Sequence, residues 1–349
     1  MRQILGIQAL RGLAALSIAT LHIGQAAGAF VGTPGVAPYG WMRRVPWEAG
    51  VDVFFVISGF VIVYASAGLF GRADSIGDFL SRRLARVVPL YWLVTSLLIL
   101  LALLGPVALN EPLGNGFHYV LASYLFIPWP RPDGAMQPVF RLGWTLNYEM
   151  LFYLIVAALL PLSRRLAIPL VAAAVIAVAG AGALFGPTQP QLAFWTDPIV
   201  LEFAYGVLLA AAWFAGLRLP TPLRLALAAA AIPMMLLNGT AHGIDRAFAF
   251  GLPAACLVAA GALGTERRAN PALARTCLLL GDMSYALYLT HLFPMRALRE
   301  VWARLHPGGI GIAAYILVSI AVASLLALGV NAWFEKPATR TARVVLRTA

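Results

Sequence analysis

Long apolar runs recur along the entire chain, and they constrain its fold more than any other feature. Residues 166–186 and 310–331, for example, contain no charged side chain. A stretch of roughly 18 or more apolar residues is long enough to cross the hydrocarbon core of a bilayer as an α-helix. Charged residues make up only 11% of the chain, less than half the share that is usual in soluble domains. The sequence therefore predicts a multi-pass, all-α membrane protein.

We predict a polytopic bundle of about ten transmembrane helices. The expected spans are 5–27, 48–68, 84–105, 143–162, 166–186, 197–215, 224–239, 246–264, 278–297 and 310–331. Most of the 25 lysine and arginine residues then lie in cytoplasmic segments if both termini are cytoplasmic, as the positive-inside rule favours. We expect one transmembrane domain over residues 1–335 and a short basic cytoplasmic tail over residues 336–349.

The formal net charge of +11 comes almost entirely from arginine, which in a soluble chain would suggest nucleic-acid binding. Here the arginines flank apolar runs, where cytoplasmic loops collect them, so we expect no nucleic-acid partner. The only cysteines, Cys256 and Cys277, lie in or beside apolar segments and match no metal-ligand spacing. We therefore predict no metal site.

Two ionisable residues, Arg11 and His22, lie inside the first apolar run. Their spacing places them on one face of a helix, roughly 16 Å apart along its axis. A cation near the cytoplasmic end and an imidazole deeper in the membrane suit an extended anionic ligand. The alternative is a snorkelling arginine and a structural histidine that bonds a neighbouring helix.

Arg83 and Arg86 are three residues apart at the expected start of the third helix and share a face. Free backbone N–H groups and the helix dipole favour anions at such a position, and arginine can bind phosphate through two donors. These residues are therefore candidates for a phosphate-bearing ligand. The alternative is an ordinary basic flank on the cytoplasmic side.

Several polar residues elsewhere in the apolar runs are further candidates. Asp52 is a candidate partner for a cation. Glu149 lies inside an apolar segment, where it either orients a histidine or acts as a base, or else forms an ion pair with a buried arginine. Ser284, Tyr288 and His291 share one helical face. His291 is either a second catalytic group or a hydrogen-bonded structural histidine.

Motifs of other enzyme classes, such as the G-x-S-x-G elbow, H-E-x-x-H and the Walker loop, do not occur. Two rival classes fit intramembrane ionisable residues: a secondary transporter or flippase for lipids or glycans, and a lipid-linked sugar transferase. A transporter would favour paired interrupted helices in two related halves, and the sequence shows no such halves.

Taken in order, the polar segments resemble the acyltransferase-3 family of membrane proteins, which acylate polysaccharides, lipopolysaccharide, glucans or small natural products. The matching segments are Leu10-Arg11-Gly12 with His22, Phe54-Phe55-Val56-Ile57-Ser58-Gly59-Phe60, Arg83-x-x-Arg86 with Pro89, Trp144-Thr145-Leu146 with Glu149, and Ser284-Tyr285-x-x-Tyr288-Leu289-x-His291. Each segment alone is weakly specific, whereas the ordered set is strong. The resemblance covers residues 9 to 291.

The resemblance implies an O-acyltransferase of the bacterial inner membrane that uses acetyl-CoA or another acyl-CoA. It implies that Arg83 and Arg86 lie near the phosphates of the acyl-CoA, with Arg11 in the same tunnel as His22. His22 is then the catalytic residue, acting either as general base or through an acyl-histidine intermediate, with Glu149 as its expected carboxylate partner.

The expected acceptor is a hydroxyl of a cell-surface saccharide, a glycolipid or a similar compound. Thr145 and Asn147 stand where many relatives carry serines, a departure that bears on acceptor contacts. The chain shows no counterpart of the soluble esterase-like domain of some relatives, so we expect the membrane domain or a partner to handle the acceptor. The supporting or acceptor-binding candidates are Asp52, Trp144, Asn147, Tyr285, Tyr288 and His291.

Overall fold

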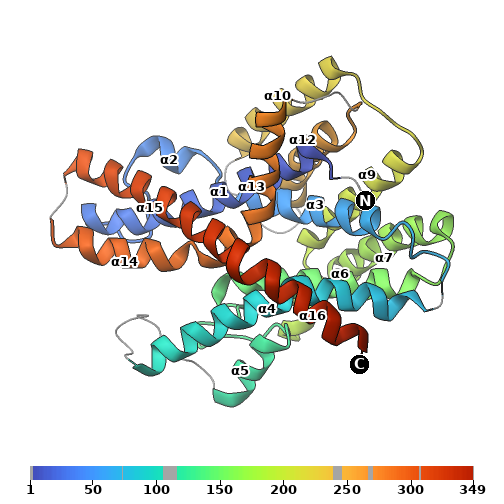
Figure 1. Cartoon of the computed structure of the whole chain (residues 1–349), viewed down its shortest axis with the longest axis horizontal. Helices are drawn as coiled ribbons and strands as arrows, with labels where there is room; N and C mark the ends of the chain where they lie inside the picture. The colour runs from blue at the N-terminus through green and yellow to red at the C-terminus, as the bar shows by residue number, and fades with distance from the viewer. Residues whose placement is uncertain are drawn as a thin grey trace. The chain divides into compact units, whose positions relative to one another are not determined.

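Helices make up most of the part of the chain that the computed structural model describes, residues 3–72, 74–104, 116–238, 246–265, 270–305 and 308–348 (Figure 1). In these ranges β-structure is limited to isolated bridges between Pro130 and Met136 and between Leu219 and Gly264. The expected all-α fold class is confirmed. The helices gather into two compact units, each built from two stretches of chain.

The first unit comprises Met1–Ile57 and Ala212–Phe334. Its helices are α1 (Leu5–Ala27), α2 (Gly40–Arg44), the first half of α3 (Ala49–Ala65), α10 (Thr221–Asn238), α12 (Leu252–Ala262), α13 (Pro271–Thr290), α14 (Leu292–Ala303) and α15 (Gly309–Val330). Two π-helical turns, η5 (Ala247–Gly251) and η6 (Asn331–Glu335), precede α12 and follow α15.

The second unit comprises Ser58–Ala211 and Glu335–Ala349. Its helices are α4 (Ser75–Leu104), α5 (Gly116–Tyr124), α6 (Trp144–Leu159), α7 (Arg164–Phe185), α8 (Pro190–Trp195), most of α9 (Leu201–Phe214) and α16 (Lys336–Thr348). The single turns η3 (Arg141–Gly143) and η4 (Pro198–Val200) lead into α6 and α9.

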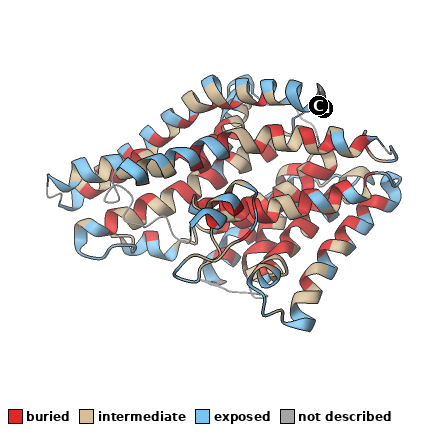
Figure 2. Ribbon diagram, turned by 90° about the horizontal axis from the view of Figure 1, so that it is seen from below, coloured by how far each residue is buried: buried red, intermediate tan, exposed pale blue. Residues whose placement is uncertain are grey.

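Helix α1 packs closely along α13 because small residues line the contact. A Cβ atom on Gly12 would lie 2.5 Å from the Cβ of Leu280, and one on Gly281 would lie 1.9 Å from Oε1 of Gln8. Glycines of this kind let helix backbones approach within a membrane. Buried residues recur along α1 at helical spacing, and Figure 2 shows similar alternation of buried and exposed residues on other helices. Helix α13 is thereby held beside the face of α1 that carries the candidate residues.

Six helical stretches of the described chain are long and apolar enough to cross a membrane. They are Leu5–Val31, Ser75–Leu104, Arg141–Leu159, Arg164–Phe185, Pro190–Phe214 and Gly309–Leu346. Large apolar side chains are exposed on them, including Leu317 and Leu325 of α15 at 69% and 67%, as expected of residues that face lipid. Shorter apolar helices cover Ala49–Ala65, Thr221–Leu237 and Ala247–Ala262. The ten-span count and the cytoplasmic placement of both termini stay predictions.

The ninth expected span, residues 278–297, is wrong as a single helix. Helix α13 starts earlier, at Pro271, and ends at Thr290, and α14 begins at Leu292. Pro294 lacks a backbone N–H, and its ring clashes with the carbonyl four residues back in a continuous helix. The break places His291 at the junction of the two helices.

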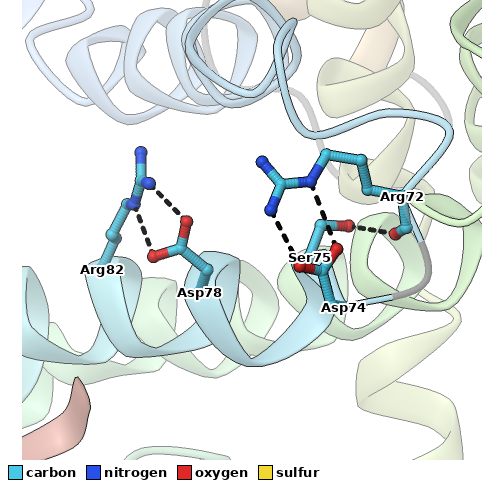
Figure 3. Close-up of polar contacts among 5 residues, drawn as sticks. All are labelled: Arg72, Asp74, Ser75, Asp78 and Arg82. Carbon is cyan, nitrogen blue, oxygen red and sulfur yellow. Dashed lines mark hydrogen bonds and ion pairs between the residues drawn. The ribbon is translucent and has the colours of Figure 1, made fainter.

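The expected start of the third helix at residue 84 is also wrong, because α4 already begins at Ser75. Two forked ion pairs stabilise its beginning (Figure 3). Asp78 accepts hydrogen bonds from Nε and from a terminal nitrogen of Arg82, one turn later, and Arg72 pairs with Asp74 in the same two-pronged way. The Arg72 guanidinium lowers the pKa of the Asp74 carboxyl.

Residues 336–348 of the expected basic tail form α16, which packs against α4 (Figure 1). Its cations Lys336, Arg340 and Arg343 are exposed and recur at spacings of four and three residues. They therefore share a helical face. Thr339, in contrast, is buried.

Candidate functional site

The candidate residues fall into two groups, one in each compact unit. Arg11, His22, Asp52 and the candidates of α13 belong to the first unit. Arg83, Arg86, Glu149 and the other candidates of α6 belong to the second.

His22 is hydrogen-bonded to His291. Nδ1 of His22, on α1, lies 2.9 Å from Nε2 of His291, at the junction of α13 and α14. Nδ1 of His291 lies 2.9 Å from the carbonyl oxygen of Leu287, one turn back on α13. His291 is completely buried, whereas His22 is only partly so. The contact joins residues from opposite ends of the chain, which the α1–α13 packing brings together.

Arg11 lies nearer the N-terminal end of α1 than His22 and is partly buried. One of its terminal nitrogens donates to Oε1 of Gln8 at 3.3 Å. Gln8 is itself buried and sits against Gly281 of α13. This amide therefore holds the guanidinium of Arg11 near α13, the helix that directly precedes His291.

The other candidates of α13 have distinct surroundings. Ser284 is buried and donates to the carbonyl oxygen of Gly281 at 2.8 Å, so its hydroxyl bonds within its own helix. Tyr288 is buried and meets Phe54 of α3 edge to face, with ring centroids 5.8 Å apart. Tyr285 is partly exposed. Tyr288 thus forms part of the packed interior around His291.

Asp52 forms a buried ion pair with Arg246. Oδ2 of Asp52 lies 2.7 Å from a terminal nitrogen of Arg246, and the aspartate is completely buried. Arg246 immediately precedes η5 and lies over the ring of Phe250 at 5.5 Å. Arg246 was not among the candidate residues expected from the sequence. The sequence indicated only that Asp52, if buried, would need a cationic partner.

Arg83 lies in an aromatic and acidic environment on α4. Its guanidinium carbon is 5.5 Å from the centroid of Phe79, and Tyr153 and Glu149 of α6 are close enough to act on it electrostatically. Its Nε is buried without a hydrogen-bond partner among the described residues. Arg343 of α16 acts on it as a second positive charge. A buried N–H that lacks an acceptor, near an additional cation, suits an anionic ligand.

Arg86 differs from Arg83 because it has a carboxylate partner. One of its terminal nitrogens forms an ion pair with Oε1 of Glu335, which is only 1% exposed. Because α4 begins at Ser75, both arginines lie more than a turn inside the helix. The free backbone N–H groups of α4 belong to its first turn. They are therefore not beside Arg83 and Arg86, as we expected.

Glu149 accepts a hydrogen bond from the hydroxyl of Tyr153 at 2.6 Å, one turn along α6. The hydrogen bond of His22 is to His291. The pairing of Glu149 with His22 therefore stays a prediction. The proximity of Glu149 to Arg83 also agrees with the alternative interpretation, a structural interaction with an arginine.

Asn147 is the most unusual polar residue of α6. It is 1% exposed, yet neither its amide nitrogen nor its amide oxygen has a hydrogen-bond partner among the described residues. Unpaired buried amides are costly, and they often mark the place of a water or a ligand. Trp144 packs edge to face on Tyr148 at 5.9 Å, so aromatic rings flank this amide along the helix.

A shallow groove in the second unit is lined by Tyr148 and Phe152 of α6, Val175 of α7, Phe203 of α9 and neighbouring apolar residues. The lining of this groove is apolar apart from Tyr148. Across the described ranges, no group of three or more histidine, cysteine, aspartate or glutamate side chains is placed to hold a metal ion.

Comparison with known proteins identifies two similarities. A protein family described as an acyltransferase domain matches residues 4–328. The exopolysaccharide production protein ExoZ of Rhizobium meliloti (strain 1021) is 33% identical over 304 residues, which cover 86% of this chain and 92% of ExoZ. No solved structure shows a significant match.

Proposed function

This chain belongs to the acyltransferase-3 family, and we propose that it transfers acetyl from cytoplasmic acetyl-CoA to a hydroxyl of a cell-surface saccharide or glycolipid at the bacterial inner membrane. Family membership makes it a transferase of acyl groups and a multi-pass membrane protein. It also favours an enzyme over the transporter and flippase interpretations.

The proposed acceptor rests on the similarity to ExoZ, whose name assigns it to exopolysaccharide production. The two proteins align over most of both chains, and the family match over residues 4–328 contains His22, Arg83, Glu149 and His291. A saccharide presents many hydroxyl groups of ordinary acidity, which need a base to become good nucleophiles. We therefore place the acceptor in the class of extracellular polysaccharides or their lipid-linked precursors.

In the proposed reaction His22 acts as the general base. The acceptor hydroxyl gives its proton to the imidazole while its oxygen attacks the thioester carbonyl. The new C–O bond forms, the C–S bond breaks, and the coenzyme A thiolate leaves and takes up a proton. The imidazole of His22 is half-buried and hydrogen-bonded through Nδ1 to His291, and a neutral imidazole can accept a proton near physiological pH.

Arg83 is the proposed contact for the donor's phosphates. Its buried Nε, which has no hydrogen-bond partner among the described residues, supports this assignment. Arg86 is proposed to act mainly through Glu335, with which it pairs. The two arginines, which share one motif in the sequence, thus have different proposed roles.

The observation that carries the proposal is the hydrogen-bonded imidazole of His22 on α1, in a chain whose family match extends over residues 4–328. The test is transfer of radiolabelled acetyl from acetyl-CoA by the purified protein in lipid nanodiscs, with extracted surface polysaccharide as acceptor. His22→Gln should lower the rate roughly 10²- to 10⁴-fold, while insertion and donor binding persist.

His118→Gln is the matched control, because His118 is an exposed histidine of α5. It should leave the rate unchanged. Near-normal turnover by His22→Gln at normal expression would refute the role of His22, and absence of acetyl transfer by the unmodified protein would refute the donor and acceptor assignment. Stable labelling of the protein without acceptor, lost in His22→Gln, would favour the acyl-histidine scheme over direct transfer.

A further inference from the structure

Both ring nitrogens of His291 are engaged. Nδ1 faces the carbonyl oxygen of Leu287 and Nε2 faces Nδ1 of His22, each at 2.9 Å. The break between α13 and α14 permits this arrangement, because it places the histidine at the end of a helix with its ring turned toward α1. His291 is 0% exposed, so protein surrounds both contacts.

The two imidazole rings meet edge to edge. Their planes differ by only 15° and their centroids are 5.2 Å apart, whereas the bonded nitrogens are 2.9 Å apart. The centroids are thus farther apart than the nitrogens by about the width of one imidazole ring. That difference arises only when the nitrogens lie on the line between the ring centres. The hydrogen bond is therefore nearly straight and lies in both ring planes, the orientation that hydrogen bonds prefer.

These contacts determine which nitrogens carry hydrogen. A carbonyl oxygen can only accept, so Nδ1 of His291 must be the donor to Leu287. Complete burial disfavours the charged form of His291, and a neutral imidazole with hydrogen on Nδ1 has an acceptor at Nε2. Nδ1 of His22 must then donate to that acceptor. When His22 is neutral, its remaining nitrogen, Nε2, is the basic atom.

We propose that His291 is a positioning residue, which holds the hydrogen of His22 on Nδ1 so that Nε2 takes the proton of the acceptor hydroxyl. This inference rests on the function proposed above. When Nε2 of His22 is protonated, its Nδ1–H becomes a stronger, charge-assisted donor to the neutral His291. The hydrogen bonds from His22 to His291 and from His291 to the Leu287 carbonyl thus orient the base and stabilise its charged form. His291 does this without contacting the substrate.

The direct test is nitrogen-15 NMR of the full chain in nanodiscs, with histidine as the labelled residue. The chain has five histidines, and His22→Gln and His291→Gln identify the two relevant sets of signals. In the unmodified protein we expect His22 to carry hydrogen on Nδ1 and to lack it on Nε2 near neutral pH. The reverse, hydrogen on Nε2 of His22 with Nδ1 as acceptor, would overturn the inference.

The kinetic test compares two replacements of His291. Leucine removes the acceptor, so we expect a kcat roughly 10- to 100-fold lower, the usual effect of losing an orienting hydrogen bond, with the KM for acetyl-CoA unchanged. Glutamine places a carbonyl oxygen near the position of Nε2 and should restore most of the kcat. His118→Leu serves as the control. Equal loss in the leucine and glutamine variants, with normal thermal stability, would make His291 a packing residue and overturn the inference.

The two proposals fail in different ways. An active His22→Gln variant would refute the proposed role of His22 as the general base, whatever the NMR result. An inactive His22→Gln variant, combined with hydrogen on Nε2 of His22 in the unmodified protein, would refute the positioning role of His291 alone.

Discussion

Replacing Arg83 and Arg86 separately with methionine should separate ligand binding from stability. Methionine keeps much of the length and apolar volume of the arginine stem and removes the charge. Arg83 has a buried Nε without a partner among the described residues, so its loss should remove a ligand contact. Arg86 pairs with the buried carboxylate of Glu335, so its loss should leave that carboxylate without this cation.

The structure sets the expected magnitudes. Glu335 is 1% exposed, and the side chain of Arg86 is 32% exposed. Removing one partner of a buried pair costs about 3–5 kcal/mol, and the partial exposure of Arg86 favours the lower end. A loss of that size lowers the unfolding midpoint by on the order of 5–10 °C. A charge-assisted contact to phosphate contributes about 1.5–3 kcal/mol, so Arg83→Met should weaken binding of coenzyme A roughly tenfold or more.

Thermal unfolding at a fixed scan rate and calorimetric titration with coenzyme A measure the two effects. Arg86→Met combined with Glu335→Gln should regain most of the lost midpoint, because removal of both charges leaves no unpaired carboxylate. Arg82→Met is the control, since Arg82 forms an ion pair on the same helix with Asp78, whose side chain is partly exposed, so its loss should cost much less stability than that of Arg86. A weaker affinity for coenzyme A in both Arg83→Met and Arg86→Met, with unchanged midpoints, would refute the division of roles.

Two further predictions follow from side-chain packing. Asn147→Leu should raise the unfolding midpoint, because it removes a buried amide without partners among the described residues. The same variant should raise the KM for the acceptor, and an unchanged KM in a transfer assay would exclude acceptor contact. Gly12→Val should prevent accumulation of folded protein, because its Cβ would lie 2.5 Å from that of Leu280. Gly40→Val is the control and should accumulate normally, because the space around Gly40 is open. Equal yields of the two variants by fluorescence-detected size exclusion would contradict the tight α1–α13 packing.

The fold class and several helices were predictable because membrane helices have a strong local signal. The first span was expected at residues 5–27 and found as Leu5–Ala27. The start of α4 was missed because its first two turns are polar, and a search for apolar length detects only the part that could cross a bilayer. The end of α13 at Thr290 was missed because apolar residues continue past it.

The site was predictable as a set of residues and not as a set of contacts. Arg11 and His22 could be placed on one helix face, because both lie on α1. The partners of His22 and Arg86 are distant in sequence, at His291 and Glu335. Such pairs arise from tertiary packing, and one sequence contains no local pattern that specifies them.

The ion pair between Arg86 and Glu335 also has a consequence for biogenesis. The second unit is completed by Glu335–Ala349, the last residues of the chain, and α16 packs on α4. At translation rates of about 5–20 residues per second, the ribosome needs on the order of 10–50 s to travel from Arg86 to Glu335. During that interval α4 is synthesised without its carboxylate partner. The pair between Arg86 and Glu335 therefore forms only after residues 212–334 of the first unit have been synthesised.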